Sequence, residues 1–171
     1  MRQVRIKWEG PFSIEEVLDL NHKEDDYGLY QVYGRHVVFG SGSLLYVGRA
    51  RDQTFGQRLQ QHIDWLREEE GVSIRVGRIA REDYAHEPPD WPDWYQVLTD
   101  AEALEIYWHS PPYNSSNISE YNGKPLWIVN EGERGSLVAE CRSDDLQPKP
   151  KDASGDTTYG ELEPPQIVPP S

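Results

Sequence analysis

The fold is decided by two apolar runs, Tyr27-Gly-Leu-Tyr-Gln-Val-Tyr-Gly34 and Leu44-Leu-Tyr-Val-Gly48, which flank a glycine-rich break. The break, Gly40-Ser-Gly-Ser43, consists of residues that favour turns. Two β-forming runs separated by such a break are typical of a β-hairpin. The residues His36-Val-Val-Phe39 add a short strand segment to this prediction.

Hydrophobic periodicity predicts the elements around the hairpin. Residues 3–8 alternate between polar and apolar side chains, which indicates an edge strand that ends at Gly10-Pro11. Ser13 then caps a short helix over residues 14–20, whose acidic first turn suits the helix dipole. The later elements are a helix over residues 55–70, a strand over 72–80, a loop over 87–93, a helix over 98–110 capped by Thr99 or Asp100, and a strand over 124–130.

Length and composition predict one folded domain followed by a tail. A chain of 171 residues is long enough to bury one substantial core. Beyond about residue 140 the chain carries nearly half of its 13 prolines and few large apolar residues. We therefore expect an α+β domain over residues 1–140, with a central, mainly antiparallel sheet flanked by helices, and a proline-rich, acidic, disordered tail over residues 141–171.

The cellular setting follows from segments that the sequence lacks. No apolar run is long enough to cross a membrane, and the basic N-terminal residues are followed by no apolar region typical of a secretory signal. The single cysteine, Cys141, cannot form an internal disulfide and fits a reducing compartment. We expect a cytoplasmic protein with no membrane partner, and the sequence leaves its oligomeric state open.

The charge is unevenly distributed. The formal net charge of −13 is opposite to that of a typical nucleic-acid binder. Between Tyr27 and Ile63, however, the chain contains four arginines and only one acid, Asp52, which gives this stretch a local net charge of +3. The charge thus weakens the expectation of tight nucleic-acid binding but still allows a basic face on an acidic protein.

An ordered set of glycines and polar residues accompanies the hairpin: Gly28-Leu29-Tyr30, Tyr46-Val47-Gly48, Arg58 with His62, and Glu102 with Asn114. Arg58 and His62 are four residues apart, which places them on one face of the predicted helix. The set resembles the GIY-YIG nuclease family over roughly residues 27–117, about half of the chain. The resemblance implies a small nuclease domain that hydrolyses phosphodiester bonds, most simply those of DNA, with one divalent metal ion.

These residues can be matched to the chemistry of phosphodiester hydrolysis. Glu102 can hold one hard cation such as Mg²⁺ or Mn²⁺, with waters and phosphate as the remaining ligands. Arg58 can donate hydrogen bonds to the non-bridging oxygens, where negative charge grows. The resemblance makes Tyr30 the general base or the group that positions the nucleophile, with the Tyr46 phenol nearby. His62 would relay a proton or contact phosphate, and Asn114 closes the same catalytic set by resemblance.

Four further residues are expected to bind substrate: Gly28, Gly48, Arg49 and His36. The glycines could instead mark strand ends, and His36 could assist Tyr30 or lie on a strand surface. Leu29 and Val47 replace the two isoleucines of the family name, which are volume-tolerant changes. Glu105 stands where an apolar residue is expected, so it is either exposed or a rival metal ligand.

Two classes of function remain open. One is a metal-dependent endonuclease, which the complete set of polar residues favours. The other is a catalytically silent GIY-YIG-like module that binds nucleic acid or a protein, which the net charge of −13 favours. A second open choice concerns Trp91-Pro-Asp-Trp94, which either stacks on bases or packs onto the core.

Overall fold

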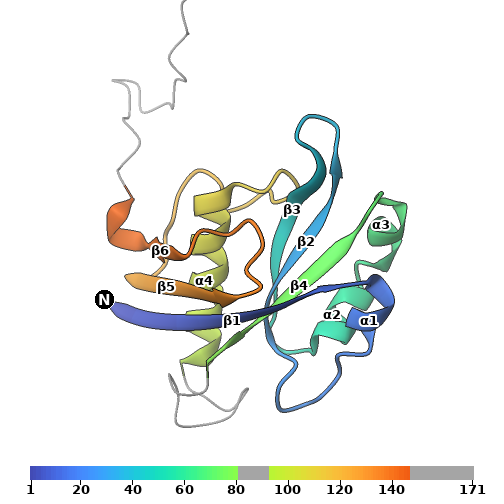
Figure 1. Cartoon of the computed structure of the whole chain (residues 1–171). Coiled ribbons are helices and arrows are strands. Elements are labelled where there is room, and N and C mark those ends of the chain that lie inside the picture. The colour runs from blue at the N-terminus through green and yellow to red at the C-terminus, as the bar shows by residue number, and fades with distance from the viewer. Residues whose placement is uncertain (81–92, 147–171) are drawn as a thin grey trace, which may run out of the picture.

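Six strands form one twisted sheet in the order β3-β2-β4-β1-β5-β6 (Figure 1). The computed structural model describes residues 1–80 and 93–146. Its elements are β1 (Arg2–Phe12), α1 (Ile14–Leu18), β2 (Gly28–His36), β3 (Gly40–Ala50), α2 (Phe55–Gln60), α3 (Ile63–Glu68), β4 (Ser73–Ile79), α4 (Trp94–His109), β5 (Leu126–Gly132), β6 (Glu140–Arg142) and the 3₁₀ helix η2 (Ser143–Asp145). Neighbouring strands are antiparallel except β1 and β5. The predicted α+β class with a mainly antiparallel sheet is confirmed.

Helices cover both faces of the sheet (Figure 1). On one face α4 packs on a core that includes Trp8 and Leu29. On the other face α1 to α3 pack on a second core that includes Tyr30 and Phe55. Because side chains alternate across a strand, the adjacent residues Leu29 and Tyr30 point into different cores. The two motif tripeptides therefore contribute to both layers.

The hairpin of β2 and β3 pairs the two motif tripeptides, with Tyr30 opposite Gly48. Its turn lies at residues 37–39 and not at Gly40-Ser-Gly-Ser43, because His36 already pairs with Gly40. The predicted extra strand at His36-Val-Val-Phe39 is therefore wrong. Val37, Val38 and Phe39 are 97%, 76% and 67% exposed at the tip. An apolar run placed in a turn has no partner strand to bury it.

β1 is an interior strand, so the predicted edge strand is wrong. It lies between β4 and β5 and continues through Gly10-Pro11 to Phe12, with an irregular register after Glu9. Only one of its faces is buried, the face that carries Val4, Ile6 and Trp8. Alternation in the sequence reports burial of one face and carries no information about which backbone edges are paired.

The predicted helix over residues 55–70 is two short helices. Gln61 and His62 donate backbone hydrogen bonds to Arg58 and Leu59, three residues back, and these bonds close α2. His62 is the residue before α3 and not part of a continuous helix with Arg58. The predicted shared helix face of Arg58 and His62 is therefore wrong.

The remaining boundaries shift modestly. The capped helix after Ser13 is confirmed as α1, and α4 begins one turn before the predicted helix because Trp94 extends its buried stripe. The predicted domain boundary at residue 140 falls inside β6, where Cys141 is fully buried. The expected tail beyond residue 146 and most of the predicted loop over residues 87–93 lie outside the described residues. Within the described ranges, no helix combines the length and apolar character needed to cross a membrane.

Candidate active site

A polar pocket of about 520 Å³ lies at the end of β3, between α2 and α4. Three arginines line it, Arg49 and Arg51 from the end of β3 and Arg58 from α2. Glu102 from α4 supplies a carboxylate. The other lining residues offer neutral or acidic oxygen atoms: Asp52, Gln53, Thr99, Ser116 and Asn117. Three guanidinium groups beside two carboxylates, Glu102 and Asp52, form a site suited to a phosphate and a hard cation together.

Glu102 and Arg49 form an ion pair inside this pocket. The Glu102 side chain is 12% exposed and that of Arg49 is 32% exposed. Burial and the neighbouring charges of Arg51 and Arg58 lower the pKa of Arg49. The positive charges of Arg51 and Arg58 thus oppose the charge of Arg49, and an anionic ligand in the pocket would relieve that repulsion.

Tyr30 is fully buried beside this pocket, and its hydroxyl makes no hydrogen bond among the described residues. Burial raises the pKa of Tyr30, the nearby Tyr46 raises it further, and Arg58 opposes the change. A Cβ on Gly48 would come within 2.5 Å of the Tyr30 hydroxyl and 2.6 Å of the Tyr46 ring. Gly48 is therefore required for space at the tyrosines. The hydroxyl lies near Arg58 and Tyr46 without a regular hydrogen bond to either, which makes Tyr30 a candidate for a functional role.

The Tyr46 ring lies next to the rings of both Tyr30 and His62. The ring centroids of Tyr30 and Tyr46 are 6.0 Å apart, and those of Tyr46 and His62 are 6.1 Å apart. Burial and the charge of Arg58 lower the pKa of His62, so its ring is neutral at pH 7. A neutral imidazole near a phenol can accept a proton. His62 thus reaches the site despite the break between α2 and α3.

Asn114 lies at the edge of the sheet, where its side chain binds backbone. Its Oδ1 accepts a hydrogen bond from the Val47 N–H at 3.0 Å, and its Nδ2 donates to the Val47 carbonyl at 2.9 Å. The adjacent Tyr113 N–H donates to Leu45 at 2.9 Å. The loop after α4 therefore acts as a short additional strand on β3. Because both ends of the amide are engaged, the geometry gives Asn114 a positioning role and not the predicted catalytic contact.

Two predicted substrate-binding residues lie elsewhere. His36 is six residues from Tyr30 along β2, which is about 20 Å in a strand, so the predicted assistance to Tyr30 is wrong. His36 instead stacks on Phe39, with ring centroids 4.8 Å apart. Gly28 is buried against β4, where a Cβ would come within 2.0 Å of the Gly77 carbonyl oxygen. Its φ of +148° also favours glycine, so its role is structural.

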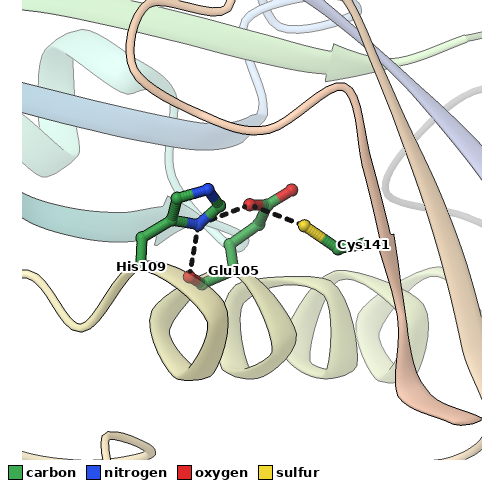
Figure 2. Close-up of side chains that lie close together, drawn as sticks. All are labelled: Glu105, His109 and Cys141. Atoms are coloured by element: carbon green, nitrogen blue, oxygen red, sulfur yellow. Dashed lines mark hydrogen bonds and ion pairs between the residues drawn. The ribbon is translucent and has the colours of Figure 1, made fainter. Parts of the chain in front are cut away.

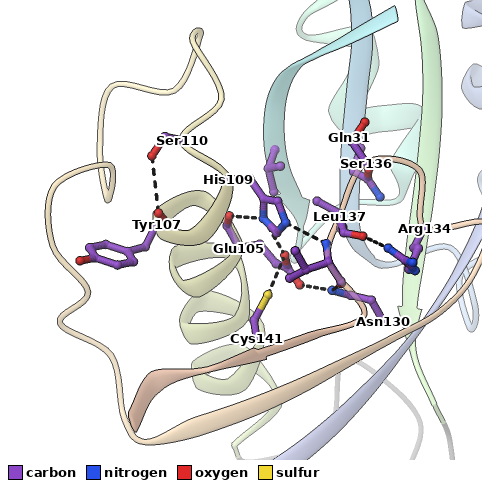
Figure 3. A network of polar contacts seen from close by, with 12 residues as sticks. Gln31, Glu105, Tyr107, His109, Ser110, Asn130, Arg134, Ser136, Leu137 and Cys141 are labelled. Carbon is purple, nitrogen blue, oxygen red and sulfur yellow. Dashed lines mark hydrogen bonds and ion pairs between the residues drawn. The ribbon is translucent and has the colours of Figure 1, made fainter. Parts of the chain in front are cut away.

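One turn beyond Glu102, Glu105 is fully buried, which excludes the exposed alternative of the two that the sequence left open. Asn130 donates to its Oε1 at 2.7 Å, while the Cys141 thiol, at 3.5 Å, and His109 Nδ1, at 3.2 Å, approach its Oε2 (Figures 2 and 3). Asn130 also accepts a hydrogen bond from Trp8 Nε1 at 2.8 Å. This network connects α4 to β1, β5 and β6. It fixes the helix that carries Glu102.

Glu105, His109 and Cys141 are also the described residues whose ligand atoms gather as a metal site would require, all within 4.8 Å (Figure 2). Their hydrogen bonds favour a different role. His109 Nε2 accepts the Val138 N–H at 3.0 Å, so its proton resides on Nδ1, which faces Glu105. A metal on Nδ1 would move that proton to Nε2, against the Val138 N–H. Burial and Glu105 also raise the pKa of the Cys141 thiol, which opposes the thiolate that a metal needs.

The protonation of His109 is governed by opposing effects. Burial lowers its pKa, but the hydrogen bond and negative charge of Glu105 outweigh burial, and the pKa lies above 6.5. Protonation would remove the acceptor of the Val138 N–H but strengthen the ion pair with Glu105, and the raised pKa means that the ion pair dominates. The network in Figure 3 therefore links α4 to the sheet.

Comparison with known proteins does not identify a family for this chain, so the functional assignment depends on the geometry of the site. The chain matches no protein-family model, no curated protein and no solved structure at a significant level.

The structure brings together most of the predicted set but adds residues that were not among the predicted site residues. Arg51 joins Arg49, Arg58 and Glu102 in the polar pocket. Trp65 and Tyr113 join Tyr46 and His62 in a neighbouring pocket. Arg51 carries a positive charge and lies three residues after Gly48, so its position in the sequence was a sufficient signal. Trp65 and Tyr113 are 48 residues apart and carried no such signal.

Proposed function

We propose that this protein is a metal-dependent endonuclease of the GIY-YIG type that hydrolyses phosphodiester bonds of nucleic acid, with DNA favoured. The observation that carries the proposal is the buried Tyr30 hydroxyl, which has no regular hydrogen bond among the described residues and whose pKa responds to Arg58, a residue that shares the polar pocket with Glu102. A core tyrosine without function would be expected to pair its hydroxyl.

The pocket residues fit a hard cation that arrives with a phosphate. Glu102 is one carboxylate, and the side chains of Thr99, Gln53 and Asn117 offer further oxygen atoms. Mg²⁺ commonly uses one or two carboxylates together with substrate phosphates and waters. In the proposed reaction the cation supplies Lewis-acid stabilisation of the phosphate, and Arg58 and Arg51 bind its non-bridging oxygens. Arg49 would turn from Glu102 to the phosphate as the cation binds.

The proposed proton transfers involve Tyr30, Tyr46 and His62. The raised pKa of Tyr30 keeps its phenol protonated at neutral pH, so Tyr30 in the free protein orients the attacking water. Positive charge at Arg58 and at a bound cation would favour the phenolate and allow Tyr30 to act as base. His62, neutral at pH 7 and near Tyr46, can accept the proton that leaves.

Glu102→Gln tests the proposal directly. The amide keeps the shape of the side chain but loses the charge that would hold the cation, so cleavage of plasmid, branched DNA and RNA with Mg²⁺ or Mn²⁺ should stop. Glu133→Gln is the matched control, because Glu133 is exposed and distant in sequence from the pocket residues. Cleavage by the wild type that persists in Glu102→Gln would overturn the proposed site.

A second candidate, a silent module that binds nucleic acid or protein, is favoured by the Glu102–Arg49 ion pair. A carboxylate already neutralised by arginine is a weaker cation ligand. Arg49→Ala separates the two functions, since it should raise the affinity for Mn²⁺ in the nuclease. In the silent module it should weaken ligand binding without creating a metal site.

A further inference from the structure

A second pocket of about 290 Å³ adjoins the tyrosine pair and is lined largely by aromatic rings. Its walls come from four segments: Tyr46 of β3, His62 before α3, Trp65 and Glu69 from α3 and its end, and Tyr113 after α4. We call this group the aromatic pocket. The two rings at its far wall, Trp65 and Tyr113, come together only because the loop after α4 is bound to β3.

The rings of the aromatic pocket meet at steep angles. Trp65 lies 6.1 Å from Tyr46 at 68°, 6.0 Å from Tyr113 at 70° and 6.1 Å from His62 at 64° between ring planes. Edge-to-face contacts of this kind stabilise the walls while leaving ring faces directed elsewhere. A planar ligand can therefore stack on a rigid aromatic surface without displacing existing stacking.

Two polar residues, His62 and Glu69, line the aromatic pocket. His62 Nε2 is buried and has no hydrogen-bond partner among the described residues. Glu69 receives the Tyr113 hydroxyl on Oε1 at 2.9 Å, and its other oxygen can accept a donor from a ligand. Glu68 and Glu70 flank Glu69 in sequence, and Glu70 pairs with Arg35 at 3.0 Å. Such acidic surroundings disfavour a phosphate but suit a neutral ring with N–H donors.

The position of the aromatic pocket connects it to the proposed chemistry. Tyr46 belongs to its wall and also lies 6.0 Å from Tyr30, measured between ring centroids. Arg58 of the polar pocket lies close enough to Tyr30 and to His62 for its charge to shift the pKa of both side chains. A nucleotide whose phosphate lies at Arg58 can therefore place its base, or that of its neighbour, among the aromatic rings.

We propose that the aromatic pocket binds an unstacked nucleobase next to the scissile phosphate, so that the substrate is single-stranded or unpaired at the cleavage site. This inference rests on the proposed nuclease function. Stacking on aromatic side chains is how proteins hold single-stranded bases, and carboxylates accept hydrogen bonds from base N–H groups. Fully paired duplex could not fill the pocket without extruding a base.

The test uses binding in the absence of turnover. The Glu102→Gln protein in EDTA is titrated with a short single strand, and with its duplex, each carrying 2-aminopurine at one position. Single strand should bind more tightly, and the probe fluorescence should change on stacking. Adding Trp65→Ala should weaken single-strand binding roughly 5- to 150-fold, as expected for loss of one stacked base. Trp108→Ala, which removes an exposed tryptophan of α4, is the matched control and should leave affinity unchanged.

Tyr113→Ala provides a second variant if Trp65→Ala does not fold, because Tyr113 is 41% exposed and its backbone hydrogen bond to Leu45 survives. If the wild type cleaves nucleic acid but both aromatic variants bind single strand as tightly as the control variant, the proposal for the aromatic pocket is overturned and the nuclease proposal is not. Absence of both cleavage and nucleic-acid binding would overturn the nuclease as well. A different result would also overturn the nucleobase proposal: tetramethylammonium quenches the tryptophan fluorescence, Trp65→Ala abolishes this quenching, and the oligonucleotide does not change the fluorescence. That result would identify the aromatic pocket as a cage for methylated amines.

Discussion

The Asn114 side chain pairs with the backbone of Val47 as a neighbouring strand would. Its amide accepts from the Val47 N–H at 3.0 Å and donates to the Val47 carbonyl at 2.9 Å, which is the pattern of a backbone neighbour in a sheet. Val47 is the central residue of the tripeptide that contains Tyr46 and Gly48. The contact therefore fixes the segment that holds the tyrosines, and links it to the loop that follows α4.

The first prediction concerns this contact. Asn114→Ala should lower the free energy of unfolding by about 2–3 kcal/mol, because it leaves two backbone groups of Val47 without partners in a buried setting. Asn122→Ala, at an exposed position, should change it by less than about 0.5 kcal/mol. Chemical denaturation of both variants measures the difference. Loss of cleavage by Asn114→Ala at unchanged stability would show that the amide contacts substrate.

The second prediction separates the two glutamates of α4. Glu105→Gln should destabilise the protein by about 2–4 kcal/mol, because three side chains converge on this buried carboxylate and the amide presents a donor to one of them. Glu102→Gln should abolish cleavage with a Tm within a few degrees of wild type, since only one partly exposed ion pair is lost. Thermal unfolding and plasmid cleavage of the two variants give the comparison. A reversed pattern would assign the metal to Glu105.

The third prediction concerns the protonation of His62. Burial and the charge of Arg58 place its pKa below 6.5, so the ring should stay neutral as pH falls through 6.5 and protonate only at lower pH. Arg58→Ala should move the pKa back toward 6.5, because one of the two causes is removed. NMR titration of the imidazole C–H protons measures this shift. If His62 accepts a proton in turnover, cleavage should decline only below pH 6.5, and His62→Gln should lack that decline.

The fourth prediction concerns salt. Three arginines in the polar pocket allow few phosphate contacts, so the log–log slope of nucleic-acid affinity against salt should be roughly −2 to −4. Arg51→Ala should make the slope about one unit less negative, while Arg58→Ala should reduce turnover more than affinity. Fluorescence anisotropy across a salt series measures the slope. A slope steeper than about −6 would place the main phosphate-binding surface elsewhere.

The fifth prediction concerns the end of the folded domain. Removal of residues 147–171 should leave Tm unchanged, because their composition offers little apolar surface. Removal of residues 141–171 should lower Tm by at least about 5 °C, because it deletes most of β6, the buried Cys141 and the core contact of Leu146. Differential scanning calorimetry compares the two truncations. Equal Tm values would show that β6 adds nothing to the stability of the sheet.

The sequence by itself determined the features that depend on local chemistry. Two apolar runs separated by a break placed Gly28–Tyr30 and Tyr46–Gly48 on paired strands, and Ser13 formed the expected helix cap. Order along the chain and the resemblance to the GIY-YIG family selected Arg49, Arg58 and Glu102, which the structure places in one pocket. These predictions agree with the structure because each depends on residues that are close in sequence, or on charged side chains, which are rarely buried unless they are paired.

Only the tertiary structure decided how distant segments meet. The interior position of β1 depends on pairing with β4 and β5, which a single strand's pattern does not encode. The burial of Glu105 depends on donors from Asn130, His109 and Cys141, and the aromatic pocket depends on Tyr113 returning to β3. Periodicity records which side of an element is buried. It does not record which other element buries it, because that choice is made by packing and hydrogen bonding over the whole domain.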